Sequence, residues 1–169
     1  MEKVIFGRYP QEENGDYLDL SWRVLSRTEK GTLMITEKII DCKPFNTDWR
    51  NCCWQTSTIR SWLKNEFVKV AFSADEKKRV KDIFLLDNEQ ASSYFANDED
   101  RLATPTEYAK KQGILQYDGN KKSMWWLRSV TDNQTHVSFV NYDGFIFVFG
   151  RKANATNYGI RPAIFLGEE

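Results

Sequence analysis

The residues best suited to chemistry are arginines and aromatic side chains in the last third of the chain. Arg128 lies in SMWWLRSV (123–130) and Arg161 in NYGIRPAIFL (157–166), both among apolar neighbours. A guanidinium in such a place either pairs with a carboxylate to stabilise the fold or binds an anionic ligand. We expect the structural role for both. Candidate partners are the carboxylates of Glu107, Asp118 and Asp143.

Two adjacent tryptophans precede Arg128, and they point to opposite faces if the segment is a strand. One ring then lies in the core, where its indole N–H needs a partner. We assign the structural role to Trp125 and expect Trp126 to line a recognition surface. The alternative, in which both rings are structural, stays open.

The segment 140–159, VNYDGFIFVFGRKANATNYG, is the best candidate for a binding surface. Phe145, Phe147 and Phe149 share one face of a predicted strand, and a sheet needs only one face for its core. The loop 150–158 then supplies Asn, Thr and Tyr, which suit adaptable contacts. An ordinary hairpin with packed aromatic residues is the alternative. The predicted binding residues are Trp126, Tyr142, Phe145, Phe147, Arg151, Asn154, Thr156, Asn157 and Tyr158.

Other catalytic and metal-binding patterns are absent from the sequence. His136 is the only histidine, and the three cysteines, Cys42, Cys52 and Cys53, form neither a disulfide framework nor a CxxC zinc motif. There is no GxSxG serine and no glycine-rich phosphate loop. The acidic run 98–100 is interpreted as a loop of solvated charge, with a calcium site as the alternative. We therefore predict no catalytic residue, no cofactor and no tightly bound metal.

Composition narrows the class of protein further. The 169 residues suit one domain, 1–169, and 41% hydrophobic with 14% aromatic residues is enough for a core. Lys+Arg and Asp+Glu are both 24, so no basic field favours nucleic acid or an anionic membrane. No apolar run reaches the length of a membrane span, and the start does not resemble a signal peptide. We expect a cytoplasmic protein whose partner is a protein or a small-molecule ligand.

The predicted elements that must position these residues come in blocks. Strand-like segments within 1–36 are followed by helices near 57–69 and 105–112, and then by strands at 124–129 and in a hairpin at 136–149. Ser73, Asp87 and Thr104 are the predicted helix caps. Because strands and helices do not alternate, the order predicts an α+β fold.

Several motifs together resemble a bacterial domain family of unknown function. They occur in that family's order and cover nearly the whole chain: SWRVL, TSTIRSWLKNEF, AFSADEK, DIFLLDNEQASSYF, RLATPTEYA, WWLRS and GIRPAIFL. A more distant resemblance joins RLATPTEYAKKQG and the terminal GIRPA to formylglycine-generating enzymes, sulfatase-modifying-factor domains and the variable proteins of diversity-generating retroelements. That resemblance implies a C-type-lectin-like fold, with two helices packed on a small twisted antiparallel sheet, first and last strands paired, and a ligand surface on the late strands and loops.

The departures from those families shape the functional expectation. Formylglycine-generating enzymes use a cysteine pair in their C-terminal part, whereas this chain has no cysteine after Cys53. The EPN, QPD and WND tripeptides of calcium-dependent lectins are also missing. We expect a non-catalytic binding module, of the retroelement-diversified or the phage- or surface-associated kind. The alternatives are an enzyme distantly related to the formylglycine-generating superfamily and a structural domain of an assembly.

Overall fold

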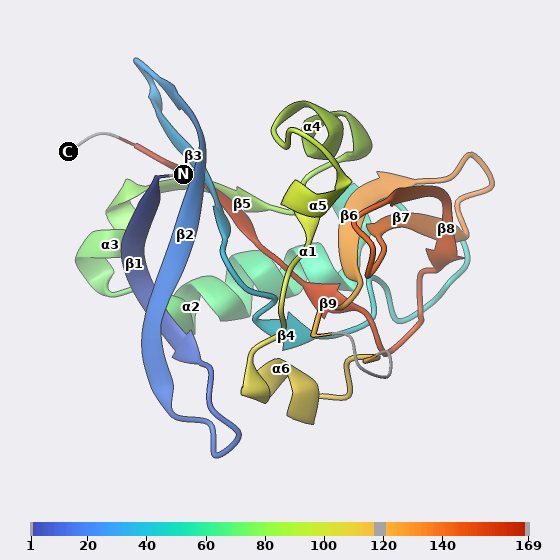
Figure 1. The fold of residues 1–169 in the computed structure, drawn as a ribbon, viewed down its shortest axis with the longest axis horizontal. Helices are drawn as coiled ribbons and strands as arrows, with labels where there is room; N and C mark the ends of the chain where they lie inside the picture. Colours follow the sequence, from blue (N-terminus) through green and yellow to red (C-terminus); the bar gives the residue numbers. More distant parts are fainter. Residues whose placement is uncertain (1, 117–120, 168–169) are drawn as a thin grey trace.

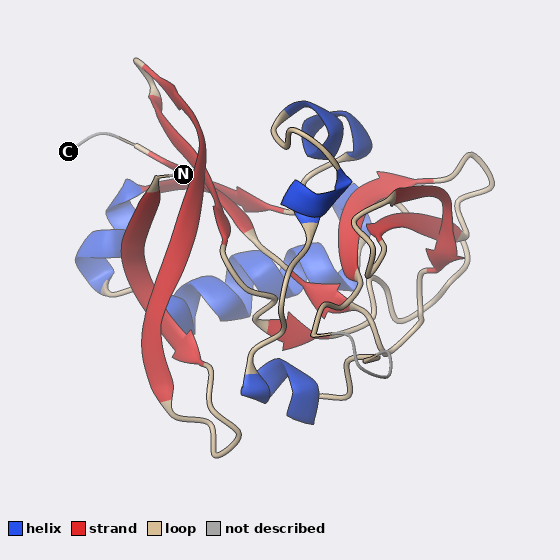
Figure 2. Cartoon of the chain, viewed as in Figure 1, coloured by secondary structure: helices blue, strands red, loops and turns tan. Residues whose placement is uncertain are grey.

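The computed structural model confirms the α+β class. It describes residues 2–116 and 121–167, which form two five-stranded sheets with short helices around them (Figures 1 and 2). Asp118, one of the predicted arginine partners, lies outside the described residues. No helix in the described ranges is long and apolar enough to cross a bilayer.

The first sheet is antiparallel and has the strand order β1-β2-β3-β10-β5. Its strands are β1 (Lys3–Pro10), β2 (Tyr17–Thr28), β3 (Gly31–Thr36), β5 (Val80–Phe84) and β10 (Ala163–Leu166). The expected pairing of the first and last strands is wrong, because β10 inserts between β3 and β5, while β1 pairs only with β2 in the described part of the chain. Val4 and Gly167 nevertheless line the same pocket, so the two ends of the described chain lie close together.

The second sheet carries the late strands and has the order β4-β9-β6-β7-β8. Its strands are β4 (Asp41–Cys42), β6 (Trp125–Val130), β7 (His136–Val140), β8 (Ile146–Lys152) and β9 (Gly159–Ile160). The predicted antiparallel hairpin is present as β7 and β8. The sheet is mixed, because β6 and β9 run parallel and meet at Trp125 and Gly159. The WWLRS and GIRPA segments are therefore neighbours, as expected.

The helices are shorter and more numerous than the two that were expected. A continuous helical run comprises α1 (Thr58–Trp62), the π-helical turn η2 (Leu63–Phe67) and α2 (Val68–Ala71). The other helices are η1 (Trp54–Thr56), α3 (Ala74–Arg79), α4 (Asn88–Ser93), α5 (Asp98–Arg101) and α6 (Glu107–Lys111). The runs near 57–69 and 105–112 do exist. The acidic run 98–100, expected to be a solvated loop, instead forms most of α5.

Capping chemistry explains where most helices begin. Ser73 and Asp87 each form the predicted capping box, with Glu76 and Gln90 respectively. The prediction of Thr104 as the cap of α6 is wrong, because Thr106 accepts the first-turn bond from Ala109 N. The physical reason is a backbone bridge between Ile39 and Pro105, which keeps the preceding residues extended.

Both faces of the first sheet are covered, and this is what positions the second sheet. One face packs against the run α1–α2. The core on this side contains Trp22, Met34, Ile83 and Ile164 from the sheet, and Ile59, Leu63 and Phe67 from the helical run. The other face packs against α4 and the second sheet. The core on this side contains Ile35, Phe84 and Ala163 from the first sheet, together with Ala91, Phe95, Trp125 and Leu127. The second sheet is therefore fixed to a central layer that is buried on both sides (Figure 1).

Candidate functional site

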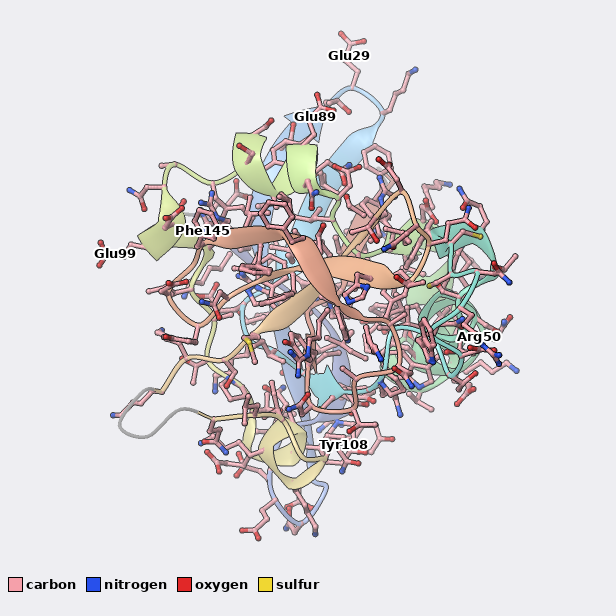
Figure 3. The ribbon with its side chains drawn as sticks, turned by 90° about the vertical axis from the view of Figure 1, so that its right-hand side faces the viewer. Glu29, Arg50, Glu89, Glu99, Tyr108 and Phe145 are labelled. Atoms are coloured by element: carbon pink, nitrogen blue, oxygen red, sulfur yellow. The ribbon has the colours of Figure 1, made fainter. Side chains whose placement is uncertain are left out.

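The most exposed aromatic surface lies on β8, at the edge of the second sheet. Phe149 is 79% exposed, Phe145 54%, Val148 50% and Phe147 38%. We call these four residues the aromatic edge. Figure 3 shows Phe145 beside the strands of this sheet on the face turned to the viewer. Within the described residues β7 is the only strand that pairs with β8, and α4 contacts part of β8. β8 is therefore an edge strand of this sheet.

A bulge in β8 is what exposes Phe149. Val137 faces Arg151 and Phe139 faces Phe147, so a single residue of β7 lies opposite three residues of β8. Gly150 has φ +69°, and a Cβ at this position would lie 2.7 Å from the Val137 backbone. Only glycine suits this left-handed, crowded position. The bulge therefore turns the strand out of its regular pairing at Phe149.

The aromatic edge stands on a row of aromatic rings that reaches the core. Phe147 stacks on Phe139 with ring centroids 5.2 Å apart, and Phe139 meets Tyr158 edge-on at 4.9 Å. Tyr158 in turn stacks on Trp126 at 4.4 Å. Such contacts limit the motion of the outer rings, so the surface is formed before any partner binds.

Two predicted binding residues are corrected by this arrangement. Trp126 is fully buried and donates its indole N–H to the Lys43 carbonyl at 3.0 Å, while Tyr158 is only 5% exposed. The alternation of the tryptophans is correct, since Trp125 and Trp126 belong to different core clusters. The expectation of an exposed ring fails because both faces of β6 are covered. Trp126 and Tyr158 support the surface from below and are not part of it.

The loop after β8 keeps most of the other predicted residues at the surface. Arg151, Asn154 and Thr156 are exposed, and Asn157 and Tyr142 are half-buried. The loop backbone is held to neighbouring segments at both ends, by Asn46 N to Ala153 O at 2.9 Å, by Leu115 N to Asn157 O at 2.9 Å and by the Cys42 thiol to Thr156 O at 3.2 Å. The loop 150–158 is thus held in place beside the aromatic edge, and we call it the border loop.

A buried polar pair lies beneath this border. Asp41 in β4 is 2% exposed and accepts a bond from the Tyr9 hydroxyl at 2.7 Å. Burial raises the pKa of Asp41, and burial beside this carboxylate also raises the pKa of Tyr9. Lys43 Nζ lies 4.0 Å from the Asp41 carboxylate and packs over the Trp62 ring. No local sequence pattern signals this pair, because its members are 32 residues apart.

Arg128 pairs with a carboxylate, but not with one of those expected. Its guanidinium binds the Asp87 carboxylate at 2.9 Å and the Gln90 side chain at 3.2 Å. Glu107 instead pairs with Lys110, one turn along α6, and Asp143 accepts a bond from Phe145 N. Neither of these two carboxylates pairs with Arg128, so Glu107 and Asp143 are wrong as its partners, and the structural role of Arg128 stays a prediction.

Arg161 is held by carbonyl groups and rings. It is 2% exposed, donates from Nε to Thr36 O at 2.7 Å and from Nη1 to Arg101 O at 3.4 Å, and lies 5.1 Å from the Trp125 ring centre. The prediction of a bound carboxylate is therefore corrected. Burial lowers the pKa of Arg161 to about 9, so the side chain is charged at neutral pH.

The acidic residues of α5 bind two further buried arginines. Asp100 pairs with Arg23 at 2.6 Å, and Asp98 pairs with Arg101. Arg101 also donates from Nε to the Gly144 carbonyl at 2.8 Å, which ties the β7–β8 turn to α5. The expected solvated run is thus partly structural. Within the described ranges, no three His, Cys, Asp or Glu residues are grouped so as to hold a metal ion.

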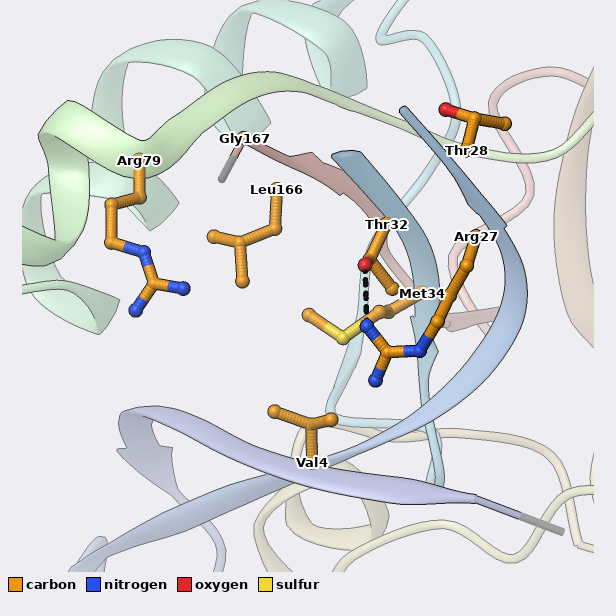
Figure 4. A pocket seen from close by; sticks show the side chains of 8 residues that line it. All are labelled: Val4, Arg27, Thr28, Thr32, Met34, Arg79, Leu166 and Gly167. Atoms are coloured by element: carbon orange, nitrogen blue, oxygen red, sulfur yellow. Dashed lines mark hydrogen bonds between the residues drawn. The ribbon is translucent and has the colours of Figure 1, made fainter. Parts of the chain in front are cut away.

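A hollow on the opposite side of the molecule lies between β1, β3 and the end of β10, with a volume of about 390 Å³ (Figure 4). Arg27 reaches into it but already pairs with Glu2 and donates to Thr32 Oγ1 at 2.9 Å. Arg79 packs over the Phe6 ring at 5.7 Å. Because the Arg27 guanidinium is already engaged, this hollow is a weaker candidate than the aromatic edge.

The three thiols differ enough for a direct chemical test. Cys53 is half-exposed, and a hydrogen bond with Thr56 lowers its pKa. Cys42 and Cys52 are buried, which raises their pKa values to about 12 and about 11. We predict that iodoacetamide alkylates Cys53 at least about tenfold faster than either buried thiol at neutral pH. Peptide mass spectrometry measures the three rates. Equal rates for Cys52 and Cys53 would contradict the described burial.

The model of one protein family matches residues 83–167, and its description is "Domain of unknown function (DUF6273)". The chain belongs to this family. The DUF6273 match begins within β5 and runs to the end of β10. It contains the whole aromatic edge, the border loop, Arg128 and Arg161. No curated protein and no solved structure matches the chain. The site must therefore be interpreted from its own geometry.

Proposed function

We propose that this DUF6273 protein is a non-catalytic binding module of C-type-lectin-like architecture, and that the aromatic edge of β8 binds a partner protein. One observation carries the proposal. Phe149 is 79% exposed on a bulged edge strand. The Phe147 ring beside it is stacked on the buried ring of Phe139. Exposed aromatic groups on a rigid support are typical of interface centres.

The arrangement of the late strands supports the finer fold assignment. The helical run α1–α2 and the short α6 lie around the two sheets, and the β7–β8 hairpin projects at one end of the molecule (Figure 1). In the C-type-lectin-like fold that the sequence motifs resemble, the late strands and loops form the ligand surface. The aromatic edge and the border loop occupy that place here.

The edge also suggests the form of the partner. A strand that is unpaired on one side can accept an extended peptide, which adds to the sheet through backbone hydrogen bonds. Phe147 and Phe149 would contact alternate apolar side chains of that peptide. At the end of β8, Arg151 and Lys152 are exposed. We therefore propose an extended peptide segment with alternating apolar residues and an acidic residue near its Arg151 end.

A selection from a random peptide library tests this proposal. We expect the wild-type protein to enrich peptides with alternating apolar residues and at least one Asp or Glu. The double variant Phe147→Ser/Phe149→Ser should bind the enriched peptides about 100-fold more weakly, because two aromatic anchors at an interface together contribute roughly 3 kcal/mol. Fluorescence anisotropy with a labelled peptide measures the ratio.

The matched control is Val70→Ser. Val70 is 50% exposed on α2, so the substitution removes a comparable exposed apolar group far along the chain from β8. We expect its peptide affinity to equal that of the wild type. The proposal fails if the enriched peptides bind the double variant as tightly as the wild type.

A further inference from the structure

A second groove lies on the first sheet, at the end of the face that α4 only partly covers. Its volume is about 390 Å³, and its lining includes Ser26, Leu33, Asp82, Tyr94 and Phe165. This volume lies within the range of small-molecule sites. The groove involves none of the aromatic edge, so it is independent of the function proposed above.

Strand register places four of these residues in one row. Ser26 faces Leu33 across β2 and β3, Leu33 faces Phe165 across β3 and β10, and Phe165 faces Asp82 across β10 and β5. Residues that face each other across strands share one side of the sheet. At about 4.8 Å per strand, the row from Ser26 to Asp82 is roughly 14 Å long. Its centre is apolar and its two ends are polar.

The apolar floor consists of side chains that the fold already holds in place. Leu33 and Phe84 are 7% and 8% exposed and belong to the core, whereas Phe165 is only partly buried. The Arg128 guanidinium lies 5.0 Å from the Phe84 ring centre. Arg128 also binds Asp87 and Gln90 at the start of α4, which fixes the helix that forms the wall. A floor formed in advance lowers the entropy cost of binding an aromatic ring.

The wall and the polar end define what else the ligand must carry. Tyr94 and Gln90 line the groove from α4. The Asp82 side chain is half-exposed, and both Lys64 Nζ at 2.8 Å and Ile83 N at 2.9 Å bind its Oδ1 atom. Among the described residues no hydrogen bond goes to the second oxygen, Oδ2, so it is the acceptor left for a ligand. An N–H donor is the complementary group for a carboxylate.

We propose that this groove binds a small planar aromatic amine, with its ring on Phe165 and Leu33 beside Tyr94 and its ammonium group on Asp82 Oδ2. The paired Lys64 leaves the Asp82 end without a net negative charge. The contact with the amine therefore depends on the charge-assisted hydrogen bond, while the ring contact depends on the apolar floor. An anionic analogue of the same size lacks the N–H donor that Asp82 Oδ2 would accept from.

Tryptamine is the probe, and indole-3-propionate is the comparator in which a carboxylate replaces the amine. We expect tryptamine to shift the amide resonances of β3, β5, β10 and α4 in a ¹⁵N NMR titration. The comparator should bind at least about tenfold more weakly. Asp82→Asn should weaken tryptamine about tenfold and remove its advantage over the comparator, and Tyr94→Ala should weaken both ligands.

Val70→Ser is again the control, with tryptamine affinity equal to that of the wild type. Asp82 and Tyr94 are partly exposed, so both variants should give dispersed native spectra. The inference is overturned if tryptamine shifts no resonance along the groove. It is also overturned if wild-type protein binds both ligands equally, or if Asp82→Asn retains the wild-type preference for tryptamine.

Discussion

Arg161→Ala is expected to destabilise the protein by roughly 3–5 kcal/mol, the range for truncating a large buried side chain. The loss has two parts. The Thr36 and Arg101 carbonyls lose a donor inside the core, and Trp125 and Phe95 lose the guanidinium that packs against both rings. Arg161 stands between β9 and β10, so its bonds tie this junction to the end of β3 and to the end of α5. Urea denaturation measures the free energy of unfolding.

Two variants make that measurement specific. Arg161→Met keeps most of the side-chain volume but loses the charge and the donors, so it should cost about 1–3 kcal/mol. Arg128→Ala should cost less than Arg161→Ala, because Arg128 is 26% exposed and water can replace its bond to Asp87. If Arg161→Ala unfolds at the same urea concentration as the wild type, the structural role given to this arginine is wrong.

Gly144→Ala is expected to displace the β7–β8 turn from α5 and to destabilise the protein by roughly 2–5 kcal/mol. Gly144 has φ +87°, and a Cβ there would lie 1.8 Å from the Asp98 carbonyl oxygen. The Gly144 carbonyl also accepts the bond from Arg101, so the turn cannot retreat without losing that bond. Because the turn precedes Phe145, peptide binding at the aromatic edge should fall with stability.

Gly15→Ala is the matched control for this substitution. Gly15 has nearly the same backbone angle, φ +86°, and nothing lies within 4 Å of the position that a Cβ would occupy there. It should therefore show only the cost of a left-handed alanine, about 1–2 kcal/mol. The difference between the two variants measures the contact with Asp98. Equal destabilisation by both variants would show that the turn does not press against α5.

Sequence patterns predicted the elements whose signals are local. The capping boxes at Ser73 and Asp87 depend on residues three positions apart, and the strand character of 125–130 follows from its composition. The alternation of Trp125 and Trp126 was also correct. What local patterns could not show was that both faces of β6 are covered, because the covering residues come from distant segments such as 43–45 and 91–95.

The rest of the site depends on long-range pairing. Arg161 meets Thr36, 125 residues away, through an ordinary carbonyl that no sequence pattern distinguishes. The position of β10 between β3 and β5 also has no local signal. For the bulge at 148–150, the one clue was Gly150 inside an apolar strand, which often marks such a distortion. Phe145 and Phe147 were predicted as surface residues from alternation alone, and they are exposed.

The most direct test of the proposed function is hydrogen exchange of the protein with and without a selected peptide. If the peptide adds to the sheet, backbone amides of β8 (Ile146–Lys152) should gain protection, because they acquire hydrogen-bond partners. The outer strands of the first sheet, β1 and β5, serve as internal comparison, and their exchange should not change. Protection that appears at β1 or β5 while β8 is unchanged would contradict the account.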